Sequence, residues 1–305
     1  MFEQLHNFLS TTPFTDYRII LLLVGCGAVV GFINTIAGMA TAISYGLFMM
    51  MGLPINVANG TTRVGVLLQF ITTSVIFKKK GYLDMKTGWK VGIPVGCGAI
   101  FGALLAAVLH VKVIEIVMAI LLPIMSILLF IDRKKVAARR SAAKPVAPQQ
   151  HSAKSSAQHN SGEPIDHQYS GEPVAPQQHY RPGLSDVWIF LIFTAIGVYG
   201  GFTHSGVGLL IMFGSFFLLG LDMIRSNAIK QFAVTIYTPL ALAVFIIYGQ
   251  VHWGIALIYA VGNVIGGIIG SYASIKGGEK FIKIFVTIII ITMCTILIIR
   301  HVGGG

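Results

Sequence analysis

Charged residues are scarce in this chain. They make up 11% of its 305 residues, against about 25% in an average soluble domain. Hydrophobic residues make up 55% of the chain, and its mean hydropathy is +0.78. Several apolar stretches approach the length needed to cross a hydrocarbon core of about 30 Å. This composition excludes an ordinary soluble domain and predicts an all-α, polytopic membrane protein.

Acidic residues and cysteines are also few. All eleven Asp and Glu residues lie outside the apolar stretches or near their ends, so no carboxylate is placed for a proton relay or a cation site within the membrane. The three cysteines lie far apart in apolar segments and have no metal-binding spacing. We expect no metal site and no cofactor.

Common catalytic and nucleotide-binding motifs are missing as well. The chain contains no GxxxxGK[ST], HExxH or GxSxG pattern, so we expect no enzyme and assign no catalytic residue. The formal net charge is +11, but the cations gather in loops and in one central linker. That distribution is typical of the positive-inside rule, and it argues against binding of nucleic acid.

What the chain does contain is ten apolar segments, five in each half. They cover residues 19–36, 40–52, 57–77, 88–109 and 113–131, and then 187–202, 208–220, 225–248, 252–275 and 281–300. The low-complexity stretch between the halves carries PVAPQQH and SGEP twice each and predicts a disordered linker, with metal binding by its histidines as the alternative. We therefore expect a first transmembrane repeat over 1–131, a linker over 132–185 and a second transmembrane repeat over 186–305.

The two halves match at an offset of 168 residues without a gap. Among the related pairs are Gly38 and Gly206, Gly52 and Gly220, Asn59 and Asn227, Val66 and Val234, and Phe77 and Phe245. Because the match includes Asn, Val and Phe as well as glycine, it indicates an internal duplication. Such repeats are typical of transporters and channels.

The second segment of each half is short. Residues 40–52 would form a helix of only about 20 Å, so 19–36 and 40–52 predict a hairpin that enters the membrane and returns. Each repeat then crosses an odd number of times, and the second repeat is inverted. This scheme places seventeen Lys and Arg residues on the linker side and three on the other, which predicts a cytoplasmic linker. A single broken span is the alternative.

Two cations lie inside the apolar segments. Arg63 and Lys230 occupy nearly matching positions of the two repeats, roughly 8–9 Å below the start of their predicted helices. Snorkelling toward an interface would explain them without any function. The functional interpretation is that both help to bind an anionic substrate, because no carboxylate is placed to neutralise them.

Polar residues accompany both cations and define the candidate substrate site. Its members are Arg63, Asn59, Thr61, Thr62 and Gln69 in the first half, Lys230, Asn227 and Gln231 in the second, and Gly38, Gly206 and His204 at the breaks. At each break the second hairpin helix begins, and its free N–H groups would favour an anion. His204 is either a packing residue or a substrate donor and proton carrier.

The stretches around these residues resemble a known family. GFINTIAGMATAISYGLFMMMGLPINVANGTTRVGVLLQ (31–69) with FKKKGYLD, and GGFTHSGVGLLIMFGSFFLLGLDMIRSNAIKQ (200–231) with YGQVHW, are similar to the TauE/SafE sulfite exporters, also called the toluene-sulfonate uptake permease superfamily. The resemblance covers both halves but not the linker. It implies transport of small sulfur-containing anions across a bacterial inner membrane.

These observations predict a secondary transporter that carries a small (organo)sulfur oxyanion by alternating access around a midplane site. The expected partners are this anion and the lipid bilayer, and glycine-rich helix faces leave a homodimer open. An anion channel is the first alternative. A membrane scaffold that recruits partners through its cytoplasmic linker is the second.

Overall fold

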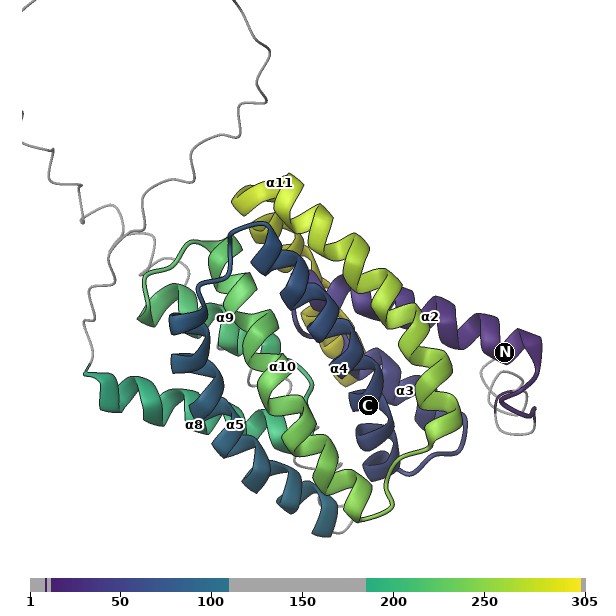
Figure 1. Cartoon of the computed structure of the whole chain (residues 1–305). Helices are drawn as coiled ribbons and strands as arrows, with labels where there is room; N and C mark the ends of the chain where they lie inside the picture. Colours follow the sequence, from purple (N-terminus) through teal and green to yellow (C-terminus); the bar gives the residue numbers. More distant parts are fainter. Residues whose placement is uncertain (1–8, 10–11, 110–184, 303–305) are drawn as a thin grey trace, which may run out of the picture.

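The chain forms only helices over the residues that the structure describes. This computed structural model covers residues 9, 12–109 and 185–302. Its helices are α2 (Tyr17–Ile36), α3 (Thr41–Met50), α4 (Ile55–Lys79), α5 (Met85–Val108), α8 (Asp186–Thr203), α9 (Val207–Leu218), α10 (Met223–Ile247) and α11 (Trp253–Val302) (Figure 1). The all-α prediction is confirmed. The predicted segment 113–131 and nearly all of the linker 132–185 lie outside the described residues, and the division into three parts stays a prediction.

Six of these helices are long and apolar enough to cross a membrane, namely α2, α4, α5, α8, α10 and α11. The other two, α3 and α9, contain 10 and 12 residues. At 1.5 Å per residue they are about 15 and 18 Å long, too short to cross alone. The short helices stand where the sequence predicts them, and the chain is a multi-pass membrane protein.

Each short helix follows a break made by residues with positive φ. α2 ends at Ile36, and Gly38 then has a φ of +76°. α8 ends at Thr203, and His204 and Gly206 follow with φ of +57° and +78°. Glycine adopts this conformation without the Cβ clash that other residues suffer, which explains the two glycines at the breaks.

The pair α2–α3 returns to the end of the helix bundle where it begins. Phe14, just before α2, and Leu53, just after α3, line the same surface hollow of about 470 Å³. His252, just before α11, lines it too. The chain therefore runs into the bundle along α2 and back along α3, which is the geometry of a hairpin.

The central helices α4 and α10, which the 168-residue offset relates, run in opposite directions. Gly60, near the start of α4, lies against the backbone of Gln250, just after α10 ends. Thr73, near the end of α4, donates a hydrogen bond of 3.0 Å to Gln231 in the first half of α10. Opposite directions are what an inverted repeat requires, and the inverted repeat itself stays a prediction.

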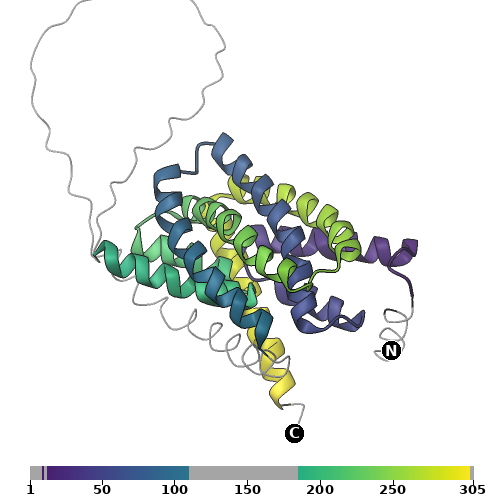
Figure 2. The same ribbon diagram turned by 60° about the horizontal axis from the view of Figure 1, so that its bottom comes forward.

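The outer helices pair across the two halves of the sequence. α2 packs along α11, and α5 lies side by side with α8 (Figure 2). Glycines set these contacts: Gly31 faces the backbone of Asn263, and Gly102 faces the backbone of Val198. A Cβ built on Gly102 would lie 1.9 Å from the Val198 carbonyl oxygen, so the glycine-rich faces bring backbones close together, as small residues do in membrane helices.

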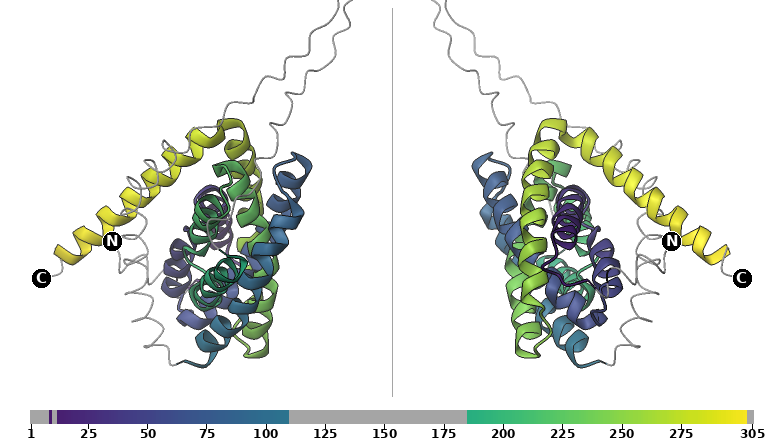
Figure 3. Two further views of the ribbon diagram at one scale, coloured as in Figure 1. Left: turned by 90° about the vertical axis from the view of Figure 1, so that its left-hand side faces the viewer. Right: turned by 90° about the vertical axis from the view of Figure 1, so that its right-hand side faces the viewer.

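The last helix, α11, changes direction once. Gly278 leaves the helical conformation, with φ of 69° and ψ of −166°. Figure 3 shows the two legs of α11 meeting at an angle. In the second leg, Phe285 packs edge-on against Phe32 of α2, with 5.7 Å between ring centroids. The two legs correspond to the predicted segments 252–275 and 281–300.

The turn between α4 and α5 contains a capping carboxylate. Asp84 accepts hydrogen bonds from the backbone N–H groups of Lys86 (3.2 Å) and Thr87 (3.1 Å), and from the Thr87 hydroxyl (2.6 Å). Partial burial alone would raise the pKa of Asp84. The hydrogen bonds favour the charged form and keep the pKa below its ordinary value of 3.8.

Replacing Asp84 with alanine should lower the free energy of unfolding by about 1 kcal/mol, because the first turn of α5 loses its cap. Since the folded pKa lies below the unfolded one, the contribution of Asp84 is complete above about pH 4 and is lost as the pH falls through the folded value. Thermal unfolding at several pH values measures both effects. Asp84→Asn keeps a good cap without titrating, so wild type and Asp84→Asn should behave alike near neutral pH and differ in how stability responds to acid. An identical acid response in the two proteins would contradict the prediction.

Candidate functional site

The two breaks meet in the middle of the molecule. A Cβ built on Gly38, in the first break, would lie 2.7 Å from the carbonyl carbon of Gly208, in the first turn of α9. A Cβ built on Gly208 would lie 3.3 Å from Cδ of Lys230. Both breaks and one of the two buried cations therefore share one region.

Arg63 reaches from α4 to the end of α8, in the other half of the sequence. Its side chain is 0% exposed. Nη2 donates to the carbonyl oxygens of Gly200 (3.2 Å) and Gly201, and Nε donates to Oδ1 of Asn59 (3.2 Å). The guanidinium carbon lies 4.9 Å from the centre of the Phe245 ring, within the range of a cation–π interaction.

Lys230 makes the corresponding contact from α10 to the end of α2. It is also 0% exposed, and its Nζ donates to the carbonyl oxygens of Thr35 (2.7 Å) and Asn34 (3.2 Å). Gln231 adds a third donor, because its Nε2 lies 2.8 Å from the Thr35 carbonyl oxygen. Neither buried cation snorkels to an interface.

These contacts explain how two cations are accommodated without a buried acid. The last carbonyls of a helix have no partner within it, and they carry the negative end of the helix dipole. Arg63 caps α8 and Lys230 caps α2, so each half of the sequence caps the broken helix of the other. No Asp or Glu among the described residues is buried. We call this arrangement the crosswise caps.

The buried cations lie deeper than the sequence indicates. α4 begins at Ile55 and α10 at Met223, two residues before the predicted starts. Arg63 is therefore eight residues into its helix and Lys230 seven, or about 12 and 10 Å at 1.5 Å per residue. Pro54 precedes the start of α4 and Asp222 caps the start of α10, and these boundary residues are signals that the search for apolar runs does not use.

Most of the predicted amides join the same two groups. Nδ2 of Asn59 donates to the Phe202 carbonyl oxygen (2.8 Å) at the end of α8. Nε2 of Gln69 donates to the Gly31 carbonyl oxygen (3.1 Å) and to the Thr35 hydroxyl (2.9 Å) in α2. Asn227 accepts a hydrogen bond of 3.0 Å from Gln231. The structure thus brings Arg63 and Asn59 to one break, and Lys230, Gln231, Asn227 and Gln69 to the other.

Two residues of the predicted substrate site, Thr61 and Thr62, make their hydrogen bonds away from the breaks. The Thr61 hydroxyl accepts a hydrogen bond of 2.9 Å from the backbone N–H of His252, in the turn between α10 and α11. The Thr62 hydroxyl donates to the Ala58 carbonyl oxygen (2.8 Å) within its own helix. Both hydroxyls are therefore occupied by contacts that position α4.

His204 lies at the second break, beside Gly206. It is buried, and its φ of +57° is a conformation that residues other than glycine rarely adopt. Its Nδ1 lies 2.6 Å from the Tyr237 hydroxyl of α10. The ring is thus held at the same break that Arg63 reaches.

Several buried polar atoms around the breaks have no partner among the described residues. They include Nη1 of Arg63, Nδ2 of Asn227 and the hydroxyls of Thr41, Thr203 and Ser205. Buried polar groups are nearly always hydrogen-bonded, so such a cluster calls for an explanation. All of these atoms can donate a hydrogen bond, which makes the breaks suited to a ligand that accepts hydrogen bonds.

Sequence reasoning missed part of this region. Tyr45 of α3 places its hydroxyl between Oδ1 of Asn59 (3.0 Å) and the Thr203 carbonyl oxygen. Thr35 supplies the carbonyl that Lys230 binds. The 168-residue offset relates Thr35 to Thr203, and this match is a signal that could have identified both. No comparable signal marks Tyr45.

The described residues hold no group of three or more His, Cys, Asp or Glu side chains that could bind a metal ion. The linker histidines, the alternative metal ligands, lie outside these residues. The candidate site is therefore built from two cations, amides, hydroxyls and helix ends.

Comparison with known proteins assigns the chain to a family. The sequence profile described as "Sulfite exporter TauE/SafE" matches residues 23–297, which include both breaks and both buried cations. The chain belongs to the TauE/SafE family. A "Probable membrane transporter protein ORF9" from Sinorhizobium sp is 23% identical over 277 residues, covering 91% of each chain. A "Probable membrane transporter protein" from Haemophilus influenzae is 20% identical over 270 residues, covering 88% of this chain and 91% of that protein. No solved structure matches.

Membership of the TauE/SafE family makes the chain a membrane transporter, with the lipid bilayer and a small-molecule substrate as its partners. The match runs along nearly the whole chain, so both halves of the sequence belong to one family unit. In this TauE/SafE protein the crosswise caps hold Arg63 and Lys230, the two charged side chains that are buried among the described residues.

Proposed function

We propose that the protein transports a small (organo)sulfur oxyanion, such as sulfite or a sulfonate, by alternating access around the two breaks. One observation carries this proposal: a fully buried guanidinium keeps its Nη1 without a partner among the described residues. A cation at such a site attracts anions strongly, because the surrounding dielectric is low.

The chemistry of the break favours an oxyanion. A sulfite or sulfonate group presents three oxygens, and each accepts hydrogen bonds. Arg63 can donate from Nη1, and the unpartnered hydroxyls of Thr203 and Ser205 are on the same break. α9 begins at Val207 without a side-chain cap, so its first N–H groups also favour an anion. A guanidinium and a helix start are frequent partners of oxyanions.

The closed state of the site supports alternating access. Arg63 and Lys230 are both fully buried, so a substrate between the breaks would be shut off from both sides. Transport then requires other conformations that open the site to one side at a time. Rocking of one repeat against the other around a central site is the usual way in which repeat-built transporters do this.

We also propose that the protein resides in a bacterial inner membrane with the linker in the cytoplasm. Both relatives named above come from bacteria. The cations of the turn that follows α4 gather on the predicted linker side, as the positive-inside rule requires. A homodimer stays a prediction.

Uptake into proteoliposomes tests the proposal. We expect purified protein to accumulate labelled sulfite or sulfonate with saturable kinetics, and unlabelled sulfite to compete with it. Phosphate and chloride are the comparison anions and should compete weakly. Flux that rises linearly with anion concentration would favour an anion channel. Flux equal to that of protein-free liposomes for every sulfur oxyanion would overturn the proposal.

A further inference from the structure

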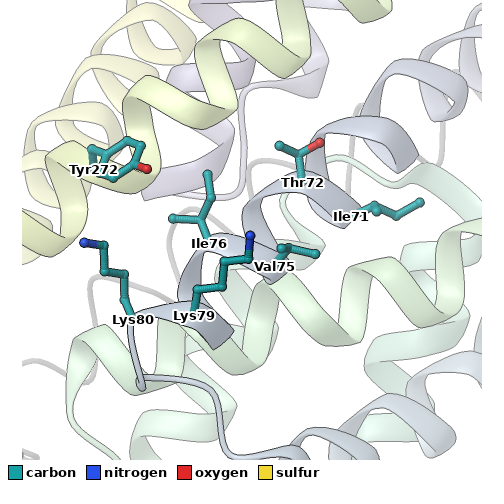
Figure 4. A pocket seen from close by; sticks show the side chains of 7 residues that line it. All are labelled: Ile71, Thr72, Val75, Ile76, Lys79, Lys80 and Tyr272. Carbon is teal, nitrogen blue, oxygen red and sulfur yellow. The ribbon is translucent and has the colours of Figure 1, made fainter.

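A groove lies on the outside of the bundle between α4 and α11. Its volume is about 610 Å³. It is lined on one side by α4 and its end and on the other by Tyr272 of α11, and the residues on the first side are Ile71, Thr72, Val75, Ile76, Lys79 and Lys80 (Figure 4). It is separate from the crosswise caps, which are buried between the breaks. Neither the family match nor the relatives' names assign it a role.

The groove changes character along its length. Ile71 and Val75, one turn apart on α4, form an apolar wall and are 41% and 46% exposed. Lys79 and Lys80 follow where α4 ends. From Ile71 to Lys79 the helix rises about 12 Å, at 1.5 Å per residue. One end of the groove is therefore apolar and the other is cationic.

Neither Lys79 nor Lys80 forms an ion pair with an acidic residue in the described part of the chain. The ion pairs in that part belong to Lys90, Arg225 and Lys283. Asp84, in the turn after α4, is engaged by the first turn of α5. The Lys80 ammonium lies 6.0 Å from the centre of the Tyr272 ring, which holds it beside the groove.

We propose that this groove binds an anionic phospholipid, with the headgroup phosphate between Lys79 and Lys80 and the start of an acyl chain along Ile71 and Val75. The apolar and cationic ends of the groove follow the same order as the acyl chain and headgroup of a phospholipid. α4 is a membrane-spanning helix, and its cationic end lies at the depth of the lipid headgroups. A soluble anion would leave the apolar wall uncovered. A protein partner would have to reach a wall that faces lipid along a spanning helix.

Native mass spectrometry of the full chain, purified in detergent, tests the proposal. The probes are phosphatidylglycerol and phosphatidylcholine with identical acyl chains. We expect wild type to retain phosphatidylglycerol in preference to phosphatidylcholine. Lys79→Gln combined with Lys80→Gln should weaken phosphatidylglycerol binding by about 25-fold, at about fivefold for each charged contact to the phosphate that is lost.

Lys78→Gln is the matched control. Lys78 belongs to the same run of three lysines and is exposed, but it does not line the groove. The affinity of Lys78→Gln for phosphatidylglycerol should stay within about twofold of wild type, because Lys78 makes no contact in the groove and its exposed charge is screened by salt. Equal losses of phosphatidylglycerol affinity in the control and the double variant would overturn the proposal, because they would mean that the lipid responds to the overall surface charge and not to the groove. Unchanged binding in the double variant would also overturn it. The proposal would also be overturned if glycerol phosphate displaced phosphatidylglycerol as effectively as the lipid itself does. A dimer that covers the groove and excludes lipid from it would overturn it too.

Discussion

Replacing Arg63 with lysine should raise the anion concentration needed for half-maximal transport by about 10- to 100-fold. Lysine keeps the charge but has a single nitrogen. Its three N–H groups start from one point, so they cannot bind the α8 carbonyls and also place a donor where Nη1 of Arg63 lies. The loss of one charge-assisted hydrogen bond corresponds to a change of this size. Concentration-dependent sulfite uptake in proteoliposomes measures it.

The same variant separates binding from folding. The lysine ammonium can still bind a carbonyl oxygen at the end of α8, so the unfolding temperature of Arg63→Lys should stay close to that of wild type. Arg18→Lys is the matched control, because Arg18 is exposed and lies in the first turn of α2, at the opposite end of that helix from the break. If Arg63→Lys reached half-maximal transport at the same anion concentration as wild type, Arg63 would not be part of the substrate site.

The second large effect concerns the contact between α2 and α11. Gly31→Ala should lower the unfolding temperature by about 5 °C or more, because the added Cβ would lie 2.3 Å from the Asn263 carbonyl oxygen. That atom belongs to the backbone and cannot rotate away. The helices must separate, and the packing beside the Thr35 end of α2 is then disturbed.

Gly25→Ala on the same helix is the matched control. Nothing lies within 4 Å of a Cβ at Gly25, and alanine is the better helix former by about 1 kcal/mol. Its unfolding temperature should therefore be unchanged or slightly higher. The two substitutions have the same chemistry and opposite expected signs, so a thermal-shift assay decides between them. Equal shifts would mean that close α2–α11 packing is not what Gly31 provides.

Local features of the fold could be predicted from the sequence because each has a local cause. Long apolar runs indicate spanning helices, and Gly38 and Gly206 mark the breaks through their positive φ. The predicted starts of α4 and α10 fall two residues late. Pro54 and Asp222 precede the actual starts of α4 and α10, and hydropathy does not register such flanking residues.

The crosswise caps could not be predicted in the same way. The sequence indicates that Arg63 needs a negative partner, and it offers no carboxylate. The partner is the Gly200 and Gly201 carbonyls, 137 and 138 residues away along the chain. Every residue has such a carbonyl, so only the path of the chain decides which ones a cation meets. For the same reason, the contact between Tyr237 and His204 leaves no trace in the sequence pattern.

Pairing across the two halves has a consequence for biosynthesis. α2 emerges from the ribosome long before its neighbour α11, and α5 long before its neighbour α8. The glycine face of α2 therefore lacks its partner until α11 is made, and the glycine face of α5 lacks its partner until α8 is made. Lys230 likewise arrives late to the end of α2. A chain cut between the halves would yield two fragments that each lack half of every such contact, and they would be expected to mature only when made together.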